Sequence, residues 1–266
     1  MRFNTCGVTC SLMFAVLLVS PSQTFGDLVA HWSFDADYTE DTGTRNGTLV
    51  DTNGNSGLDT TVKQFGVGSL HLSNDQSDYV DIPNSITLRH DTNGYSISFW
   101  AKKHSNNNNS MALGNRLVGP SYIWLHKQNN IIFRTGTDTH NTTSKYALTS
   151  DTGWHHIVIV NDGTQSNNMT FYVDNMFATL AYGGGTHTAD FIVNTIGDAW
   201  HETTRWAYHG HIDEVWIFDH AIEQNIVDTL FESNSIPEPS CIGLLTIGGI
   251  IAITWRHRPR WGNPRQ

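Results

Sequence analysis

Short segments in which apolar and polar residues alternate recur along most of this chain. Val, Ile, Phe, Tyr and Trp fill these segments, and Gly, Asn, Asp and Thr separate one segment from the next. A period of two places alternate side chains on one face of a β-strand, and the separating residues favour tight turns. The predicted strands are Leu28–Phe34, Gly68–Leu72, Tyr79–Ile82, Tyr95–Lys102, Ser121–Lys127, Ile131–Thr135, Tyr146–Thr149, Trp154–Asn161, Met169–Val173, Phe177–Ala181, Phe191–Gly197 and His211–Phe218. So many short strands predict an all-β fold of two packed antiparallel sheets.

One segment departs from this alternation. Between Ala221 and Phe231, Ile222, Ile226 and Leu230 recur at helical spacing, and Asp219 precedes them as a candidate N-cap. This pattern predicts one short helix near the C-terminal end of the domain.

The charge composition excludes one class of partner. Only 15% of the residues are charged, against about 25% in an ordinary soluble domain. The formal net charge is −10, and no cluster of Lys and Arg lies in the body of the chain to neutralise phosphates. We therefore expect no nucleic-acid partner.

The first 26 residues predict a secretory signal peptide. Arg2 precedes an apolar run from Ser11 to Val19, and Pro21 then leads into small and polar residues up to Gly26. We expect cleavage after Gly26 and export of the remainder. A buried first strand is the weaker interpretation, because the run is short and Pro21 would break it.

The other end of the chain, residues 233–266, predicts a membrane segment. Ser240–Trp255 contains no charged residue, and a cluster of arginines follows directly. The length of this apolar segment is at the short limit for crossing a bilayer. The arginines would stay in the cytoplasm and leave the body of the protein outside. A plain C-terminal membrane anchor would have the same features.

A tripeptide just before this segment makes the pattern more specific. Pro237, Glu238 and Pro239, the apolar segment and the arginines resemble the PEP-CTERM sorting signal of exported bacterial proteins. This resemblance implies a membrane-embedded, transpeptidase-like processing enzyme as partner. It also implies a transient stay in the inner membrane before delivery to the cell surface or extracellular matrix.

Between the two ends, residues 27–232 form the predicted domain. The three cysteines, Cys6, Cys10 and Cys241, all fall in the terminal segments, so the body contains no disulfide, catalytic thiol or cysteine-based metal site. The body is strongly acidic once the arginines of the ends are set aside. Its length suits a single β-sandwich.

Several segments of the body match one family pattern in order. They include Trp32-Ser33-Phe34-Asp35, Asp41-Thr42-Gly43, Asp78–Pro83, Ser96–Lys102 and Gly210–Phe218. The series resembles the laminin-G-like, concanavalin-A-like jelly rolls of secreted bacterial proteins. This resemblance implies a two-sheet antiparallel jelly-roll sandwich with adjacent first and last strands. It also implies a module that binds glycans or proteins without catalysis, often with a structural calcium ion.

The last predicted strand contains an irregularity. Ile212 and Val215 cannot both point inward in a regular strand, and a bulge at Asp213–Glu214 would reconcile them. Such a bulge turns one of these carboxylates toward the first strand, whose exit carries Asp35 and Asp41. Together with the family resemblance, this predicts a calcium site made by Asp35, Asp41 and Asp213. The alternative is that these acids are turn and edge residues without a metal.

An enzymatic interpretation can be tested on the same strand. Jelly-roll glucanases of the wider superfamily carry a Glu-x-Asp-x-x-Glu pattern there, but His211 and Trp216 stand at the two glutamate positions. Since retaining hydrolysis requires two carboxylates, we expect no catalytic residues and no glycanase activity from this motif. His209 and His211 lack a third partner at metal spacing, which favours a surface pair.

The best overall hypothesis is therefore an exported, non-catalytic binding or adhesion module. Aromatic residues in or beside predicted loops offer surfaces for sugar rings, although a place in the core would explain them equally well. These are Trp124, Trp200, Trp206, Tyr182 and Tyr208. No ligand-binding residue is assigned. A glycan-active enzyme and a purely structural surface protein are the alternatives.

Overall fold

The computed structural model describes residues 28–235, with gaps at 74–77, 92, 107–108, 118, 120, 137–140, 149–150, 164–168, 179, 184–188 and 202–203. The predicted signal peptide with its cleavage point after Gly26, and the sorting motif Pro237, Glu238 and Pro239, lie outside the described residues. None of the helices in the described part is long and apolar enough to cross a membrane.

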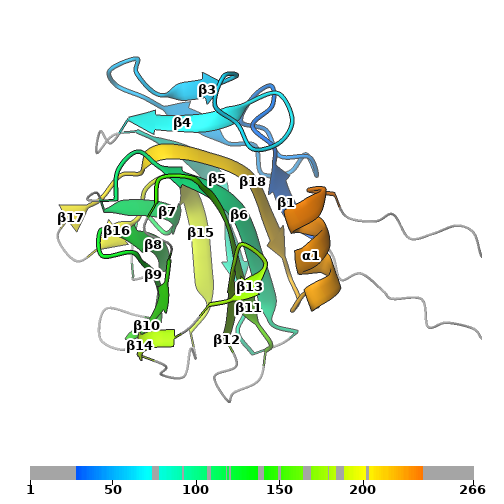
Figure 1. The fold of residues 1–266 in the computed structure, drawn as a ribbon. Coiled ribbons are helices and arrows are strands. Elements are labelled where there is room, and N and C mark those ends of the chain that lie inside the picture. The colour runs from blue at the N-terminus through cyan, green and yellow to red at the C-terminus, as the bar shows by residue number, and fades with distance from the viewer. Residues whose placement is uncertain are drawn as a thin grey trace, which may run out of the picture. The chain divides into compact units, whose positions relative to one another are not determined.

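The described chain folds into two antiparallel sheets that pack face to face, as Figure 1 shows. Sheet A has the order β13 (Met176–Phe177), β12 (Met169–Val173), β11 (Trp154–Asn161), β6 (Tyr95–Lys103), β18 (His209–Phe218), β4 (Ser69–Ser73) and β3 (Gly57–Asp59), and β1 (Leu28–Trp32) also pairs with β18. Sheet B has the order β14 (Leu180–Gly183), β10 (Asn141–Ala147), β9 (Asn130–Gly136), β8 (Tyr122–His126), β7 (Ser110–Gly114), β15 (Phe191–Ile196), β5 (Tyr79–Leu88) and β2 (Thr48–Val50). A small ribbon pairs β16 (Trp200–His201) with β17 (Thr204–Arg205). The predicted jelly-roll sandwich is thus confirmed.

The core lies between the two sheets, where alternate residues of each strand point inward. Ile97 and Phe99 of β6 and Ile157 of β11 are fully buried from sheet A, and Phe133 of β9 is fully buried from sheet B. The Phe133 ring stacks on Phe191 with 5.0 Å between centroids. Burial of this apolar area is the main stabilising contribution to the sandwich.

Most strand predictions were right, and the misses have local causes. The bounds predicted for β11 and β12 match the structure, whereas β2, β3, β7, β16 and β17 were not predicted and the predicted strand Tyr146–Thr149 covers only the end of β10. β2 and β3 each have only three residues, too few to show a period of two. β7 is buried along its whole length, so its sequence does not alternate. The predicted strand Phe177–Ala181 is divided between β13 and β14.

The single helix of the described chain, α1 (Gln224–Glu232), covers part of the outer face of sheet A (Figure 1). Phe231 stacks on Trp100 of β6 with 5.6 Å between ring centroids. The predicted cap Asp219 is wrong, because the helix begins later and Glu223 occupies the N-cap position without a side-chain hydrogen bond. The chain before the helix is held instead by Ser96, whose hydroxyl accepts a hydrogen bond from the Ile222 backbone N–H at 2.9 Å.

The predicted bulge in the last strand is confirmed. The register of β18 against β6 shifts between Asp213 and Trp216, and Glu214 has a φ of 51°. β18 pairs with β1, so the first and last strands are adjacent, as the family resemblance implied. The bulge places the two neighbouring carboxylates in different surroundings.

Candidate functional site

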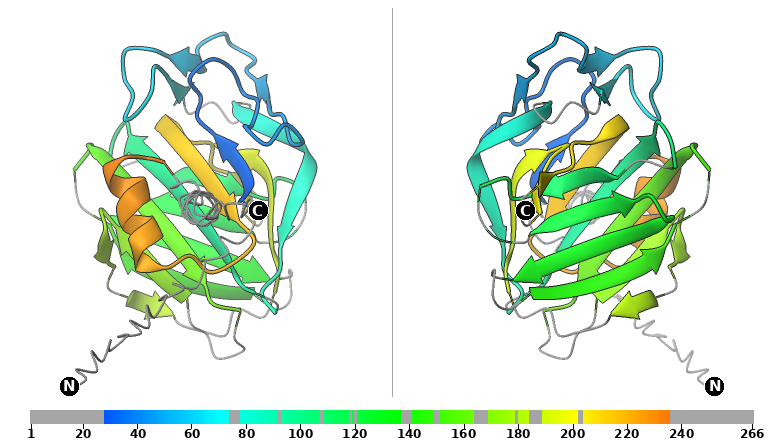
Figure 2. Two further views of the ribbon diagram at one scale, coloured as in Figure 1. Left: turned by 90° about the vertical axis from the view of Figure 1, so that its right-hand side faces the viewer. Right: turned by 90° about the vertical axis from the view of Figure 1, so that its left-hand side faces the viewer.

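A cluster of large side chains lies on the outer face of sheet B, away from the main core. Tyr122 and Trp124, two positions apart on β8, project to this face because Ile123 between them points into the core. Met111 of β7 and Ile132 of β9 pack beside them. Figure 2 (right) shows these strands from this side of the molecule.

Trp206 covers this aromatic cluster from the segment that precedes β18. Its ring lies 4.3 Å from Trp124, measured between centroids, and it remains partly exposed. A backbone hydrogen bond of 3.0 Å from Met111 N–H to the Trp206 carbonyl oxygen fixes this segment against β7. Trp124 itself is 7% exposed, so Trp206 is the ring of this pair that faces solvent more.

Polar groups border the aromatic cluster. Arg134 donates a hydrogen bond from Nη1 to the Tyr122 hydroxyl at 3.1 Å. The His126 ring meets Trp124 edge-on, with 4.6 Å between centroids. Lys103 donates to the His126 carbonyl oxygen at 3.3 Å, and burial lowers the pKa of this amine to about 8. An aromatic surface bordered by hydrogen-bond donors is suited to a neutral or acidic polar ligand with one apolar face.

Two of the three predicted calcium ligands meet at one loop. Asp213 is fully buried, and its Oδ2 accepts hydrogen bonds from the backbone N–H groups of Gln64 at 2.9 Å and Phe65 at 3.2 Å. Asp35 accepts from the backbone N–H of Gly68 at 3.0 Å, at the other end of the same loop. A side chain at Gly66 would collide with the Asp35 carboxylate, so this loop closes tightly around it.

Asp213 has an unusual environment for a carboxylate. Burial raises its pKa to about 7, and the nearby charges of Glu214 and Asp35 contribute to the rise. Its second oxygen, Oδ1, is buried and accepts no hydrogen bond from the described residues. A buried carboxylate oxygen without a partner, close to a second carboxylate, is an arrangement that a cation would stabilise.

The third predicted ligand, Asp41, lies in a different network. Its Oδ2 is 2.5 Å from Nδ1 of His31, and Glu214 Oε2 is 2.6 Å from Nε2 of the same ring. Trp216 stacks on His31 with 3.5 Å between centroids. Of the two carboxylates at the bulge, Glu214 is thus the one that turns toward the first strand.

A second group of potential metal ligands lies elsewhere. Within the residues that the structure describes, His90, Asp91 and Asp190 form the one group of three or more His, Cys, Asp or Glu ligand atoms within 4.8 Å of one another. Asp91 is paired with Arg89 at 3.2 Å, and Asp190 with the His90 ring at 2.8 Å. Calcium binding by Asp35, Asp41 and Asp213 stays a prediction.

Comparison with known families decides the classification. Residues 74–228, more than half of the chain, match the family model Laminin_G_3, described as the concanavalin A-like lectin/glucanases superfamily. The chain belongs to this superfamily. No curated protein sequence is significantly similar to it.

Solved structures with the same fold have diverse functions. Domain 4 of AbnA, a GH43 extracellular arabinanase from Geobacillus stearothermophilus solved with arabinotriose, has a TM-score of 0.50 and 20% identity over 78% of this chain and 99% of that one. The botulinum neurotoxin serotype G binding domain has a TM-score of 0.51 and 16% identity over 77% of this chain and 50% of that one. The binding domain of botulinum neurotoxin DC, solved with rat synaptotagmin II, has a TM-score of 0.54 and 16% identity over 78% of this chain and 52% of that one. This superfamily member spans about half the length of the neurotoxin binding domains, and at these identities the likeness shows the fold alone.

Sequence reasoning identified only part of the aromatic cluster. Trp124 and Trp206 were among the predicted loop aromatics, but Tyr208 is fully buried in the main core. The side chains of Trp200 and Tyr182 lie outside the described part. Tyr122 was not singled out, although its spacing of two from Trp124 on one strand was a usable signal.

Proposed function

We propose that this protein is a non-catalytic carbohydrate-binding module whose binding surface is the Trp206 ring, packed against the buried cluster of Tyr122 and Trp124. The observation that carries the proposal is the partly exposed Trp206 ring, stacked on Trp124 outside the main core. The C–H groups on one face of a sugar ring pack well on such an aromatic surface, because the ring is apolar there.

The groups around the cluster support a sugar ligand. Arg134 and His126 carry donors beside the rings, where they would bind hydroxyl or carboxylate oxygens. Arg134 also lies over the Tyr122 ring, 5.8 Å from its centroid, so this contact restrains the guanidinium before any ligand arrives.

The proposal excludes catalysis because the glucanase pattern on the last strand is incomplete. His211 and Trp216 occupy the positions of its two glutamates. Trp216, buried against His31, has an indole in place of the carboxylate that this mechanism requires, so it cannot act as its proton donor or nucleophile. The module would bind a polysaccharide and leave it intact.

A glycan array probed with the purified protein tests this proposal. We expect saturable binding to at least one glycan class, with Trp206→Ala weakening it at least tenfold. Phe177→Ala is the matched control, because Phe177 is 72% exposed at the edge of sheet A and should leave binding unchanged. Equal affinities of the Trp206→Ala variant and the wild type would contradict this surface.

Two further outcomes test the class of function. Release of reducing sugar from a bound polysaccharide would contradict the absence of catalysis. No binding to any glycan on the array would favour a structural protein.

We also propose that Asp35 and Asp213 hold a structural calcium ion, together with backbone carbonyl oxygens. The unpartnered Asp213 Oδ1 supports this assignment, as does the loop 64–68, whose backbone N–H groups bind both Asp213 and Asp35. Asp41 is engaged by His31 and is the least suited of the three predicted ligands. The ion would supply positive charge to a buried acidic cluster and has no role in turnover.

Thermal unfolding with and without calcium tests this second proposal. Because a ligand that binds only the native state raises apparent stability, millimolar calcium should raise the Tm relative to EGTA. Asp213→Ala should abolish the shift, whereas Asp91→Ala should preserve it because Asp91 belongs to the separate group with His90. An identical Tm in calcium and EGTA would exclude a stabilising site.

We infer finally that the protein is exported and sorted to the cell surface. This inference rests on the sequence of the two ends, with the signal peptide at 1–26 and the tripeptide Pro237-Glu238-Pro239 before an apolar segment. A surface location suits a module that binds glycans or proteins outside the cell.

A further inference from the structure

Histidines gather on the outer face of sheet A, near the start of β18. His209 and His211 both point outward, because Ile212 and the core residues of β18 point inward. His71 of β4 is the direct cross-strand partner of His211, and their ring centroids are 4.7 Å apart. His104, which follows β6, stacks on His209 at 4.1 Å.

The His211 ring is oriented by a carboxylate. Its Nε2 lies 3.0 Å from Oδ2 of Asp59 on β3. The Asp59 carboxylate also accepts hydrogen bonds from the Thr61 hydroxyl at 2.6 Å and from the Thr61 backbone N–H at 2.7 Å, which fix it beside the His211 ring. His211 Nε2 is therefore the donor, and Nδ1 carries the free lone pair of the neutral ring.

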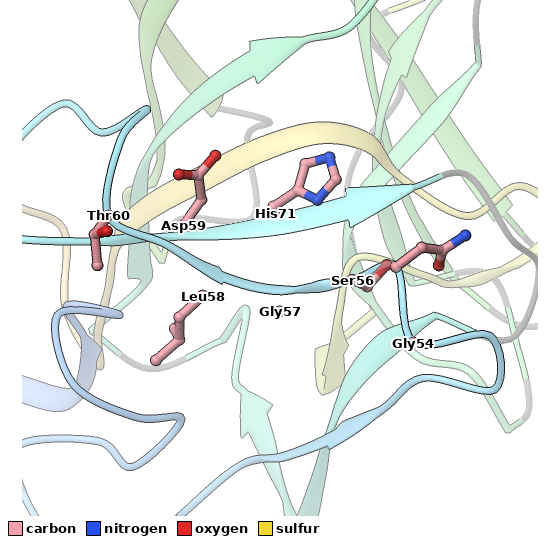
Figure 3. Close-up of a pocket in the computed structure, with 8 residues that line it drawn as sticks. Gly54, Ser56, Gly57, Leu58, Asp59, Thr60 and His71 are labelled. Atoms are coloured by element: carbon pink, nitrogen blue, oxygen red, sulfur yellow. The ribbon is translucent and has the colours of Figure 1, made fainter.

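The surroundings leave room for an additional group beside the His71 ring. A pocket of about 350 Å³ lies next to His71, lined by residues 54–60 and His71 itself. Figure 3 shows Asp59 and His71 on the same side of β3 and β4, with Leu58 on the opposite side. Lys102 of β6, the cross-strand partner of His211 on its other side, donates a hydrogen bond of 2.9 Å to the Thr152 carbonyl oxygen.

We propose that His71 and His211 bind a divalent transition metal ion such as zinc, with Asp59 as the carboxylate that positions His211. Imidazole is a preferred ligand of zinc, copper and nickel, whereas calcium prefers oxygen. A metal-bound histidine characteristically donates its other ring N–H to a carboxylate, which is the arrangement of His211 with Asp59. Water in the adjoining pocket would complete the coordination.

This site is separate from both sites already proposed. It depends neither on glycan binding at Trp206 nor on calcium at Asp35. It also differs from the group of His90, Asp91 and Asp190, in which Asp91 is paired with Arg89. His71 and His211 are direct partners on paired strands, with 40° between their ring planes, so both side chains project from adjacent positions on one face of the sheet.

Zinc titration of the full chain, purified without a histidine tag and stripped with EDTA, tests the proposal. We expect saturable binding by calorimetry, and each of His71→Gln and His211→Gln should weaken it at least tenfold. Asp59→Asn should weaken it about 10- to 100-fold, because a positioning carboxylate tunes affinity without ligating the ion. His90→Gln is the matched control and should leave zinc affinity unchanged.

Copper(II) gives a readout that loss of structure alone would not mimic. Its electron paramagnetic resonance spectrum should show coupling to nitrogens from two imidazoles in the wild type and from one in either histidine variant. Melting temperatures of the metal-free variants verify folding. If one histidine variant fails to fold, the zinc affinity and copper spectrum of the other variant test the proposal. Zinc affinity unchanged in a folded histidine variant, loss of binding in His90→Gln instead, or no saturable binding at millimolar zinc would each overturn the proposal.

Discussion

At the scale of single residues, His31 shows how the bulge in β18 contributes to stability. The ring contacts Glu214, whose side chain is 4% exposed, on one side and Asp41, whose side chain is 60% exposed, on the other. A buried hydrogen-bonded partner is costly to remove because the group left behind stays desolvated, whereas an exposed partner is replaced by water.

We therefore predict that Glu214→Ala destabilises the fold by about 2 kcal/mol, and Asp41→Ala by less than about 1 kcal/mol. Chemical denaturation of both variants measures this difference. Equal losses of unfolding free energy in the two variants would mean that burial does not make the Glu214 contact of His31 more stabilising than the Asp41 contact.

Two neighbouring histidines on β11 should have opposite effects on acid stability. Burial lowers the pKa of His156 to about 4, so the unfolded chain binds its proton first as the pH falls below 6.5. Burial opposes the charge of His155 as well, but its hydrogen bonds with Asp174 and Asp151 outweigh that effect and raise its pKa. Stabilisation by His155 is thus present below pH 6.5 and is lost as the pH rises through its folded pKa.

The prediction is that His156→Gln removes up to about 3 kcal/mol of the stability loss between pH 6.5 and pH 4. His155→Gln should instead lower stability in that range and have less effect at higher pH. Free energies of unfolding measured across this range check both signs, and parallel pH profiles of the two variants and the wild type would refute the assignment.

At the scale of elements, α1 is attached to sheet A through one apolar face. Leu230 is fully buried on that face, and Phe231 stacks on Trp100. Since truncating a buried leucine loses apolar burial and leaves a cavity, Leu230→Ala should cost about 3 kcal/mol. Asn225→Ala, at an exposed position of the same helix, should change stability by less than about 0.5 kcal/mol. Urea unfolding followed by circular dichroism compares the two, and a small effect of Leu230→Ala would mean that the helix is dispensable.

The same elements show what the sequence could predict. Alternation located most of the strands, and the mismatch in phase between Ile212 and Val215 located the bulge, because both signals are local. The pairing of His71 with His211 joins residues 140 positions apart and depends on register between β4 and β18, which no local pattern contains. For the same reason the sequence analysis grouped Asp41 with Asp213 in one calcium site, whereas in the structure the Asp41 carboxylate contacts the His31 ring.

At the scale of the whole molecule, the sandwich separates its proposed sites onto different surfaces. The aromatic cluster lies on the outer face of sheet B, and the histidine pair lies on the outer face of sheet A, with the main core between them. Ligands at these two sites would therefore not compete for space. If both proposals hold, the module would bind a glycan on one face while the other face carries a metal ion.

The proposed role at the cell surface depends on delivery, for which the terminal segments are proposed to act as signals. If Pro237, Glu238 and Pro239 are the site that a processing enzyme recognises, replacing all three by alanine should leave the protein in the membrane fraction with its C-terminal tail intact. A plain membrane anchor would give the same membrane location for the wild type and the variant. Fractionation of cells that express each form, with mass spectrometry of the C-terminus, distinguishes a sorting signal from a plain anchor. A processed wild type with an unprocessed variant supports sorting. Normal release of the variant contradicts it. The melting temperature of each form, measured in parallel, separates a change in location from a loss of folding.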